Sequence, residues 1–271
     1  RQFQFNLRNH RKLLIVDGRE AFTGGINLSV DNLARDGKPP IQDYHFHLCG
    51  PIVQELQYSF LRDWHFMTDH PADRLLHADH FPPVEAAGPA MVRMLNSGPN
   101  TAEMGILSEI VFMAIVSARR ELQIVTPYFV PPRDLLQALR CAALRGVQVD
   151  LIVPRINNHA YAGLAGRSLY ERLLEVGVRI HEREAPFMHA KALIVDRLLA
   201  IVGSANLDER SLRLNYETNV VVYDQTFICK LKQAIDGERS HSTSIDLAAW
   251  QGRPLRQKLL ENFCHLLAPI L

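Results

Sequence analysis

The chain lacks the features of disulfide-stapled and membrane-spanning proteins. Only four of its 271 residues are cysteine, and no two of them form a C-x-x-C pair. This spacing argues against a zinc ribbon or a disulfide-dense scaffold and favours free thiols in a reducing compartment. No apolar run approaches the roughly 18 residues of a spanning helix. Charged side chains interrupt the two best stretches, residues 105–118 and 190–207.

An excess of charge of one sign is also missing. The 30 Lys and Arg residues face 29 Asp and Glu residues, which gives a formal net charge of +1. Bulk charge therefore indicates no nucleic-acid partner, although a local basic patch is compatible with this balance. With 47% apolar residues the chain is rich enough in core-forming side chains to be globular rather than disordered.

What the sequence does contain is an internal repeat. Residues 9–28 and 188–207 align without a gap, and both copies contain the tetrapeptide Leu-Ile-Val-Asp. Agreement at polar as well as apolar positions is hard to obtain by chance, so we interpret the two segments as copies of one unit. The matched polar residues are His10 with His189, Lys12 with Lys191, Asp17 with Asp196 and Asn27 with Asn206.

Each copy is typical of a β-hairpin. The expected strands are residues 12–16 and 19–23 in the first copy and 190–195 and 198–202 in the second. Residues two apart in a strand point to the same face, so each copy presents a histidine and a lysine from one side of a sheet. Two such pairs from similar halves can meet at one pocket.

In the rest of the chain, segments with apolar residues at helical spacing alternate with short apolar segments typical of strands. Helices are expected at 52–64, 104–119, 134–144, 168–175, 208–212 and 225–235, and further strands at 43–48, 122–126, 147–153 and 217–223. This order predicts a duplicated α/β fold with mixed sheets flanked by helices.

The position of the copies suggests a division of the chain. A long α/β segment precedes the second copy, but only nine residues precede His10. We therefore expect residues 1–66 to be the remainder of a first repeat that is truncated at its N-terminal side, within a C-terminal fragment of a longer protein. Its sheet would expose an edge and apolar surface. Residues 67–100, rich in Pro and Gly, are the expected linker, and residues 101–240 the second repeat.

Residues 241–271 form the expected C-terminal tail with an amphipathic helix. Its apolar positions are Leu255, Leu259, Leu260, Phe263, Leu266 and Leu267. We expect this helix to pack on the core, with a helix lying in a membrane interface as the alternative.

The duplicated residues suit phosphodiester chemistry. Two lysines and two asparagines offer donors to a tetrahedral anion. One histidine can attack phosphorus to give a phosphohistidine, while the other protonates the leaving alcohol and later deprotonates the acceptor. No metal or cofactor is required. The remaining histidines around the linker lack the cysteines and close spacing of a metal site.

Carboxylates are needed to fix the histidine tautomers. Asp43 follows His10, and Glu217 follows His189, at similar intervals and at the start of the next strand. We assign these two the orienting role. Asp17 and Asp196 are counted with the catalytic set, but their position at a hairpin turn makes a role in holding the turn an alternative.

These residues resemble the duplicated H-x-K-x₄-D motif of the phospholipase D superfamily. The second copy continues as Gly203-Ser204-Ala205-Asn206, a form common in that family, whereas the first has Gly25 where Ser204 stands. The resemblance adds Asn27, Ser204 and Asn206 as phosphate-binding residues. The match is closest to bacterial cardiolipin synthases, carried by residues 6–12, 22–27, 126–131 and 203–217.

The resemblance implies a phosphatidyltransferase that makes cardiolipin from phosphatidylglycerol, with His10 as nucleophile and His189 as acid and base. It implies phospholipid substrates and a location at the bacterial inner membrane. It does not imply a nucleic-acid partner. No protein partner is expected. Two alternatives stay open: a phospholipase D-type hydrolase of lipids or nucleic acids that uses water as acceptor, and a truncated non-catalytic remnant.

Overall fold

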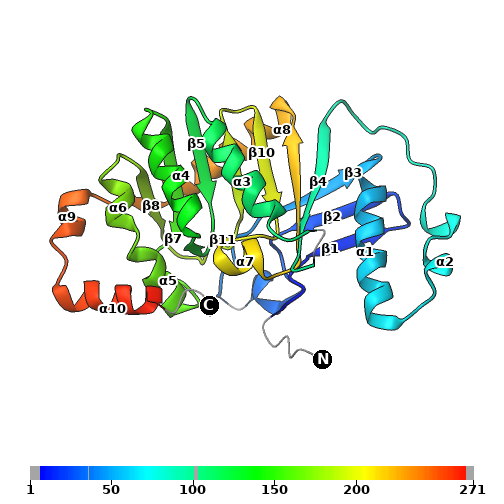
Figure 1. Ribbon diagram of the computed structural model, residues 1–271, viewed down its shortest axis with the longest axis horizontal. Helices are drawn as coiled ribbons and strands as arrows, with labels where there is room; N and C mark the ends of the chain where they lie inside the picture. Colours follow the sequence, from blue (N-terminus) through cyan, green and yellow to red (C-terminus); the bar gives the residue numbers. More distant parts are fainter. Residues whose placement is uncertain (1–6, 36, 101–102, 267–271) are drawn as a thin grey trace.

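The fold is a mixed α/β arrangement in which two sheets share a core (Figure 1). It is seen in a computed structural model that describes residues 7–35, 37–100 and 103–266. The larger sheet has eight strands in the order β13-β8-β7-β5-β9-β10-β12-β4, and the smaller has the order β1-β2-β3. The α/β class and the mixed sheets predicted from the sequence are confirmed.

The larger sheet combines a parallel and an antiparallel half. Strands β5, β7 and β8 pair in parallel, and β9, β10, β12 and β4 continue the sheet antiparallel. Its strands are β4 (Met91–Ser97), β5 (Glu121–Val125), β7 (Gln148–Pro154), β8 (Arg179–Arg183), β9 (Ala192–Val195), β10 (Leu199–Gly203), β12 (Glu217–Tyr223) and β13 (Ser242–Ser244).

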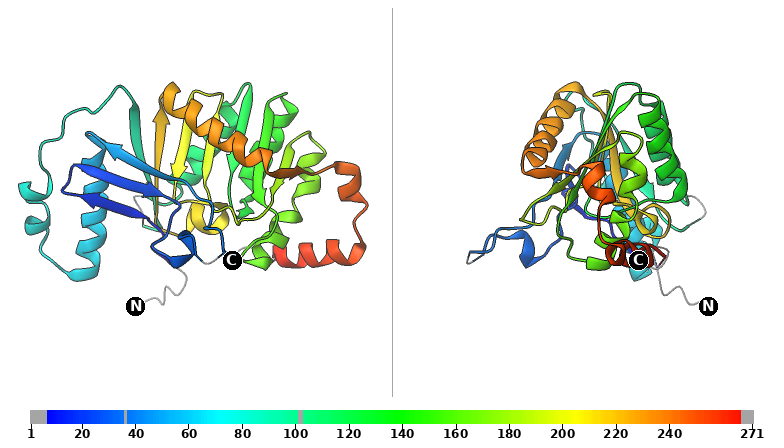
Figure 2. Two further views of the ribbon diagram at one scale, coloured as in Figure 1. Left: turned by 180° about the vertical axis from the view of Figure 1, so that it is seen from behind. Right: turned by 90° about the vertical axis from the view of Figure 1, so that its left-hand side faces the viewer.

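Helices cover the larger sheet on both faces, so its inner strands are buried almost throughout, whereas the edge strands β4 and β13 are partly exposed. Helices α3 (Ile106–Ser117) and α4 (Arg133–Leu144) lie on one face, and α8 (Gln225–Ser240) lies on the other (Figure 2). A second apolar cluster joins the α8 face to the smaller sheet and to α1 (Ile52–Thr68). The two sheets are therefore held together by one continuous core.

The smaller sheet repeats part of the larger one. Strands β1 (Leu13–Val16), β2 (Glu20–Gly24) and β3 (His45–Cys49) have the same order and antiparallel pairing as β9, β10 and β12. The expected apolar exposure on this sheet is found on β1, where Leu14 is 59% and Val16 43% exposed.

The segment predicted to be an irregular linker contains strand β4. Its seven residues pair antiparallel with β12. The Pro- and Gly-rich composition is interrupted between Pro89 and Gly98, and Val92 and Met94 in this interval pack on the same cluster as α8. This burial selects a strand that the neighbouring prolines concealed. The assignment of 67–100 as a linker between repeats otherwise stays a prediction.

Two further helices differ from the expected pattern. Helix α5 (Ala160–Arg167) lies in a segment for which no element was predicted, and α6 (Tyr170–Leu174) is shorter than the helix expected at 168–175. Gly166 is needed because a Cβ there would lie 2.7 Å from the carbonyl oxygen of Phe129. Close packing of α5 on β6 thus overrides the low helix propensity of glycine. The remaining short elements are α2 (Ala72–Leu75), β6 (Phe129–Val130), β11 (Leu207–Asp208), α7 (Glu209–Arg213) and α9 (Leu247–Gln251), with single 3₁₀ turns at Val30–Asn32 and Ala78–His80.

The C-terminal helix α10 (Leu255–Leu266) packs on α5, but through an unexpected side. Glu261 and Cys264 are its buried residues. The five apolar residues predicted to pack on the core and present in the described range are instead 50–75% exposed. Leu267 lies outside the described residues. Within those residues, no helix combines the length and apolarity that crossing a bilayer requires.

Asp196 holds the start of β5. Its carboxylate accepts hydrogen bonds from the backbone N–H groups of Arg119, Arg120 and Glu121, at 2.8, 2.7 and 2.9 Å. Asp196 and Arg197 both have positive φ, near 51° and 57°, as expected for a tight hairpin turn. Partial burial raises the pKa of Asp196, but the backbone hydrogen bonds outweigh it and lower that pKa below its usual value.

We predict that Asp196→Asn lowers the free energy of unfolding by about 1–2 kcal/mol, because the amide loses an acceptor oxygen and a charge. Asn tolerates positive φ, so backbone strain does not contribute. A lowered carboxyl pKa stabilises the fold above the unfolded-state pKa of about 4 and loses this effect as the pH falls through the folded-state value. Urea denaturation at pH 7 and pH 3 measures both effects. Asp17→Asn, at the equivalent turn, is the control and should change stability less; an equal loss from both variants would contradict the prediction.

Candidate active site

The two histidines are each paired with the carboxylate of the other copy. His10 Nδ1 lies 3.0 and 2.9 Å from the two carboxylate oxygens of Glu217. His189 Nδ1 lies 2.7 Å from Asp43 Oδ2. Sequence order placed each carboxylate with the histidine of its own copy, and this pairing is corrected: the two pairs cross between the halves.

Backbone hydrogen bonds explain the crossing. The chain around Asn9 forms a parallel bridge with Tyr216, and the N–H of His10 donates to the Tyr216 carbonyl at 2.9 Å. Gln42 forms the equivalent bridge with Met188, and the N–H of His189 donates to the Gln42 carbonyl at 2.7 Å. Each histidine is thus fixed beside the residue that precedes the other copy's carboxylate.

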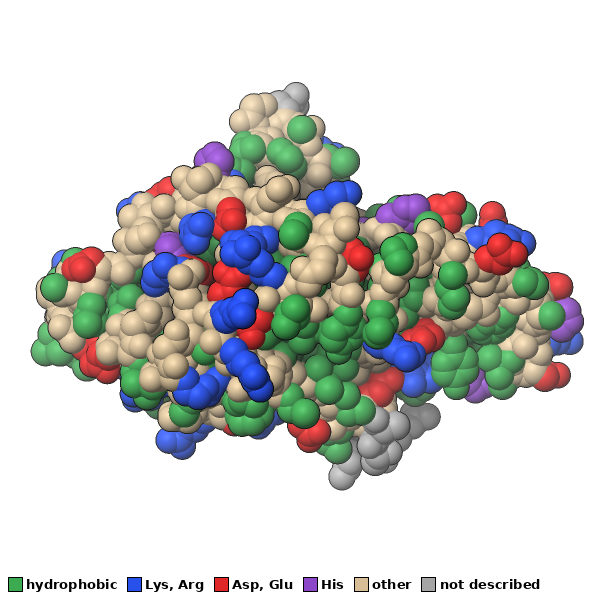
Figure 3. Space-filling view, turned by 90° about the horizontal axis from the view of Figure 1, so that it is seen from above, with side chains coloured by type: hydrophobic (Ala, Val, Ile, Leu, Met, Phe, Trp, Pro, Cys, Tyr) green, Lys and Arg blue, Asp and Glu red, His purple; other side chains and the backbone are tan. Residues whose placement is uncertain are grey.

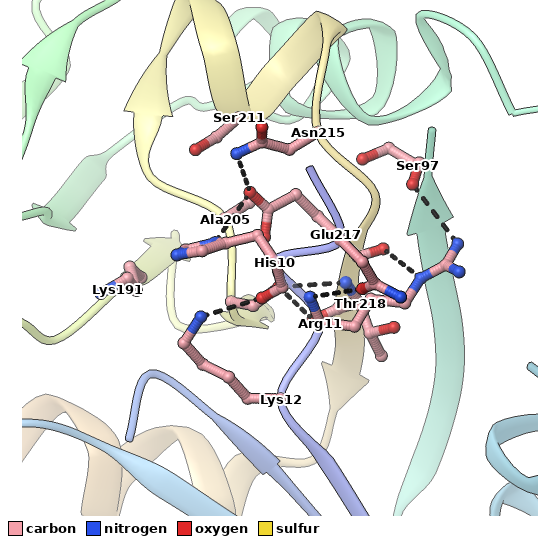
Figure 4. A network of polar contacts seen from close by, with 12 residues as sticks. His10, Arg11, Lys12, Ser97, Lys191, Ala205, Ser211, Asn215, Glu217 and Thr218 are labelled. Atoms are coloured by element: carbon pink, nitrogen blue, oxygen red, sulfur yellow. Dashed lines mark hydrogen bonds and ion pairs between the residues drawn. The ribbon is translucent and has the colours of Figure 1, made fainter. Parts of the chain in front are cut away.

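Glu217 is fully buried, and both of its carboxylate oxygens have hydrogen-bond partners (Figure 4). Besides His10, it accepts hydrogen bonds from Ser204 Oγ at 2.5 Å and from Asn215 Nδ2 at 3.1 Å. Burial raises the pKa of Glu217, but these hydrogen bonds and the His10 ring together lower it below the usual value. A charged Glu217 accepts the Nδ1 proton of His10, which leaves the lone pair on Nε2.

The structure reassigns Ser204, which the family resemblance placed on phosphate. Ser204 is fully buried, and its hydroxyl donates to Glu217 instead. In the first copy a Cβ on Gly25 would lie only 2.0 Å from Asp43 Oδ1. The glycine therefore makes room for the carboxylate of Asp43, while the second copy uses a serine to hold Glu217.

Both lysines lie against the histidine segments. Lys12 Nζ donates to the His10 carbonyl at 2.9 Å, and Lys191 Nζ donates to the His189 carbonyl and lies 2.8 Å from His189 Nδ1. Burial lowers the pKa of both lysines, that of Lys191 to about 7. Burial also lowers the pKa of His189 to about 4, despite its hydrogen bond to Asp43.

His10, His189, Asn27 and Asn206 line one pocket of about 340 Å³. Asn206 is buried, and among the described residues its Oδ1 has no hydrogen-bond partner. Asn27 is exposed. The sequence-predicted histidines and asparagines are therefore brought together, whereas Ser204 does not line this pocket.

Asp17 and Asp196 are not near the histidines. Each stands at the far turn of its hairpin, and Asp196 comes five positions after Lys191, which is roughly 16 Å along an extended strand. Asp196 binds backbone N–H groups there. The structure thus corrects their catalytic assignment and supports the alternative for Asp196, that it holds the turn.

Sequence reasoning missed residues that shape the site. Tyr128 lies edge-on to the His189 ring, with 6.1 Å between ring centroids, and its hydroxyl donates to Asn158 at 2.7 Å. Arg8 also lines the pocket, and so does Arg210, which the sequence already suggested for a phosphate contact with surface capping as the alternative. Tyr128 belongs to the 126–131 segment noted above, but single-sequence spacing carries no signal for a residue contributed from such a distance.

Arg11 was also missed, although its side chain is only 3% exposed. Its guanidinium contacts Asp63 at 2.5 Å and Glu103 at 3.0 Å and lies 5.1 Å from the Tyr216 ring centroid. In Figure 4 its guanidinium reaches the carbonyl of Ser97 on β4, and its Nε donates to the backbone carbonyl of Glu217. Arg11 thus anchors the segment that carries His10 to α1 and to the second half of the molecule.

Comparison with known proteins connects this geometry to a family. Residues 111–238 match the family described as "Cardiolipin synthase, PLD-like domain". The chain is 37% identical over 271 residues to a cardiolipin synthase of Geobacillus kaustophilus and 38% identical to cardiolipin synthase 2 of Bacillus anthracis. These alignments cover 99% of this chain but 53% and 52% of the relatives, so the chain spans about half of their length.

A solved structure shows the same fold. Phosphatidylserine synthase of Haemophilus influenzae superposes with a TM-score of 0.73 at 17% sequence identity, covering 98% of this chain and 72% of that one.

We predict that Glu217→Gln lowers turnover by about a thousandfold or more, because a glutamine amide can donate to Nδ1 and so stabilise the wrong tautomer of His10. Ser204→Ala is the matched control: it removes one hydrogen bond to Glu217 but keeps the carboxylate, so a loss nearer tenfold is expected. Steady-state rates and the ¹⁵N shifts of labelled histidine check both. Equal losses in the two variants would contradict an orienting role for Glu217.

Proposed function

We propose that this chain, which carries the PLD-like domain of the phospholipase D superfamily, transfers a phosphatidyl group between alcohols through a phosphohistidine. The observation that carries the proposal is the pair of crossed histidine–carboxylate contacts at one pocket. Two oriented imidazoles supply a nucleophile and an acid–base partner, which is what a two-step displacement at phosphorus requires.

In the proposed first step, His10 Nε2 attacks phosphorus and a P–N bond forms. The bond to the first alcohol breaks, and that alcohol takes a proton from His189. The phosphodiester anion beside His189 raises its pKa, so the proton is present when substrate is bound. In the second step the acceptor hydroxyl gives its proton to His189, the new O–P bond forms and the P–N bond breaks. Both histidines return to their starting state.

The substrate proposal rests on the relatives. Their name, cardiolipin synthase, supports phosphatidylglycerol as donor and cardiolipin with free glycerol as products. The side-chain N–H groups of Asn206 and Asn27 can donate hydrogen bonds to the oxygens of a phosphodiester. His189, with its pKa lowered to about 4, is neutral until such an anion raises that pKa. The scheme requires no cofactor.

The test is incubation of the complete protein with phosphatidylglycerol labelled in its acyl chains. Cardiolipin and free glycerol are expected; phosphatidic acid alone would indicate a hydrolase, and no turnover would refute catalysis. Quenching in detergent at neutral to mildly alkaline pH preserves the acid-labile P–N bond and assigns the roles, because His189→Ala should retain a covalent phospholipid adduct and His10→Ala should lose it. An adduct that persists in His10→Ala would overturn the nucleophile assignment.

We also propose that α10 binds the surface of the bacterial cell membrane, where its lipid substrate is found. Leu255, Leu259, Phe263 and Leu266 recur at helical spacing and are 60–75% exposed. Helix α10 lies at the same end of the molecule as α5 and α7, whose residues line the pocket (Figures 1 and 2). The opposite end, shown in Figure 3, carries basic side chains with acidic ones among them.

The double substitution Leu259→Gln and Phe263→Gln should weaken binding to phosphatidylglycerol-containing vesicles by about tenfold or more, because both side chains lose apolar burial in the interface. Co-sedimentation measures the partition. Leu198→Gln removes an equally exposed leucine from the β9–β10 turn and should leave binding unchanged. If the two proteins bind alike, α10 is not the membrane contact.

A further inference from the structure

Two arginines stand at the same pocket without a role in the scheme above. Arg8 and Arg210 both line the cavity that holds His10 and His189. The positive charge of Arg8 is close enough to Arg210 to lower the pKa of that guanidinium, together with partial burial as the larger cause. Like charges brought together beside a pocket are stabilised by an anion that contacts both.

The backbone fixes the direction of Arg8. The Arg8 carbonyl accepts from the N–H of Tyr216, and the N–H of His10 donates to the carbonyl of the same residue, so Arg8 to His10 runs as an extended segment. Side chains two apart in such a segment share a face, and their Cα atoms lie about 6.6 Å apart. Asn9 points away and donates to Asp63. Arg8 is therefore placed one step from the nucleophile and on the same wall of the pocket.

The acidic groups at this wall are already engaged. Asp208 accepts from the N–H of Ser211 at 2.6 Å, and Glu209 pairs with Arg213 at 3.0 Å. Burial raises the pKa of Asp208, and the charge of Asp208 partly offsets the lowering of the pKa of Arg210. Arg8 and Arg210 bring two positive charges to a pocket wall that also contains Asp208 and Glu209.

We infer that Arg8 and Arg210 bind the phosphate of an acceptor that is itself a phosphodiester, and so select an anionic lipid over water or a neutral alcohol. The inference rests on the proposed function and deepens it. Two phosphates linked through a three-carbon glycerol can be held at once, one at His10 and the other at the arginines. The acceptor hydroxyl then faces the phosphohistidine while His189 takes its proton.

The test compares two water-soluble acceptors, so that membrane binding of the acceptor plays no part. Glycerophosphoglycerol carries the phosphodiester, and glycerol lacks it. The complete protein is given phosphatidylglycerol in phosphatidylcholine vesicles with either acceptor labelled, and label entering the lipid is counted, because transfer to glycerol regenerates phosphatidylglycerol. Arg8→Gln and Arg210→Gln should each raise the KM for glycerophosphoglycerol by about tenfold to a hundredfold, the effect of losing a charged hydrogen bond. Transfer to glycerol should fall by a clearly smaller factor than transfer to glycerophosphoglycerol, and the quenched adduct should still form.

Arg133→Gln provides the control, since Arg133 is an exposed arginine that does not line this pocket. Arg8→Lys should recover part of the loss because it restores the charge without the planar fork. Equal losses with both acceptors, or no loss with either, would overturn the inference while the adduct still supports the proposed function. Absence of adduct and product in the unsubstituted protein would instead overturn the proposed function, and the inference with it.

Discussion

The crossed contacts between histidine and carboxylate are the constraint on which the rest of the molecule depends. His10 is held by Glu217 and His189 by Asp43, so neither half of the chain completes its own site. The backbone bridges at Tyr216 and Gln42 fix these contacts, and the shared apolar cluster holds the two sheets against each other. Stability and catalytic geometry are therefore coupled, because separating the halves would break the site and the core together.

Although the total charge is nearly neutral, the interior contains several ionisable side chains. Lys191, Glu217 and His189 are all buried, and such groups are tolerated only when each has partners. Ser204 and Asn215 satisfy Glu217, while burial shifts His189 and Lys191 toward their neutral forms. A substrate anion would complete this network by raising the pKa values of groups that burial shifts toward their neutral forms.

The sequence was sufficient for the hairpins, the class of fold and the two histidines, because a repeat reports local periodicity and chemistry at the same positions. It could not predict the crossing, since spacing along one chain contains no information on which segment lies beside which. Asp196 shows the same limit: repetition marked it as important, but only its contacts show that it binds backbone groups near β5. Strand β4 was hidden because its pairing with β12 arises from tertiary packing.

Duplication produced two histidines with similar neighbours, and small differences around them separate their roles. The His10 side chain is 28% exposed and its partner is the longer Glu217, braced by a serine. The His189 side chain is 10% exposed, and its partner Asp43 occupies the space that a glycine leaves open. Lys191 lies beside the ring nitrogen of His189, whereas Lys12 reaches only the carbonyl of His10. In the scheme we propose, this asymmetry in burial gives His10 access to the substrate and makes the pKa of His189 respond more strongly to the charge that the substrate brings.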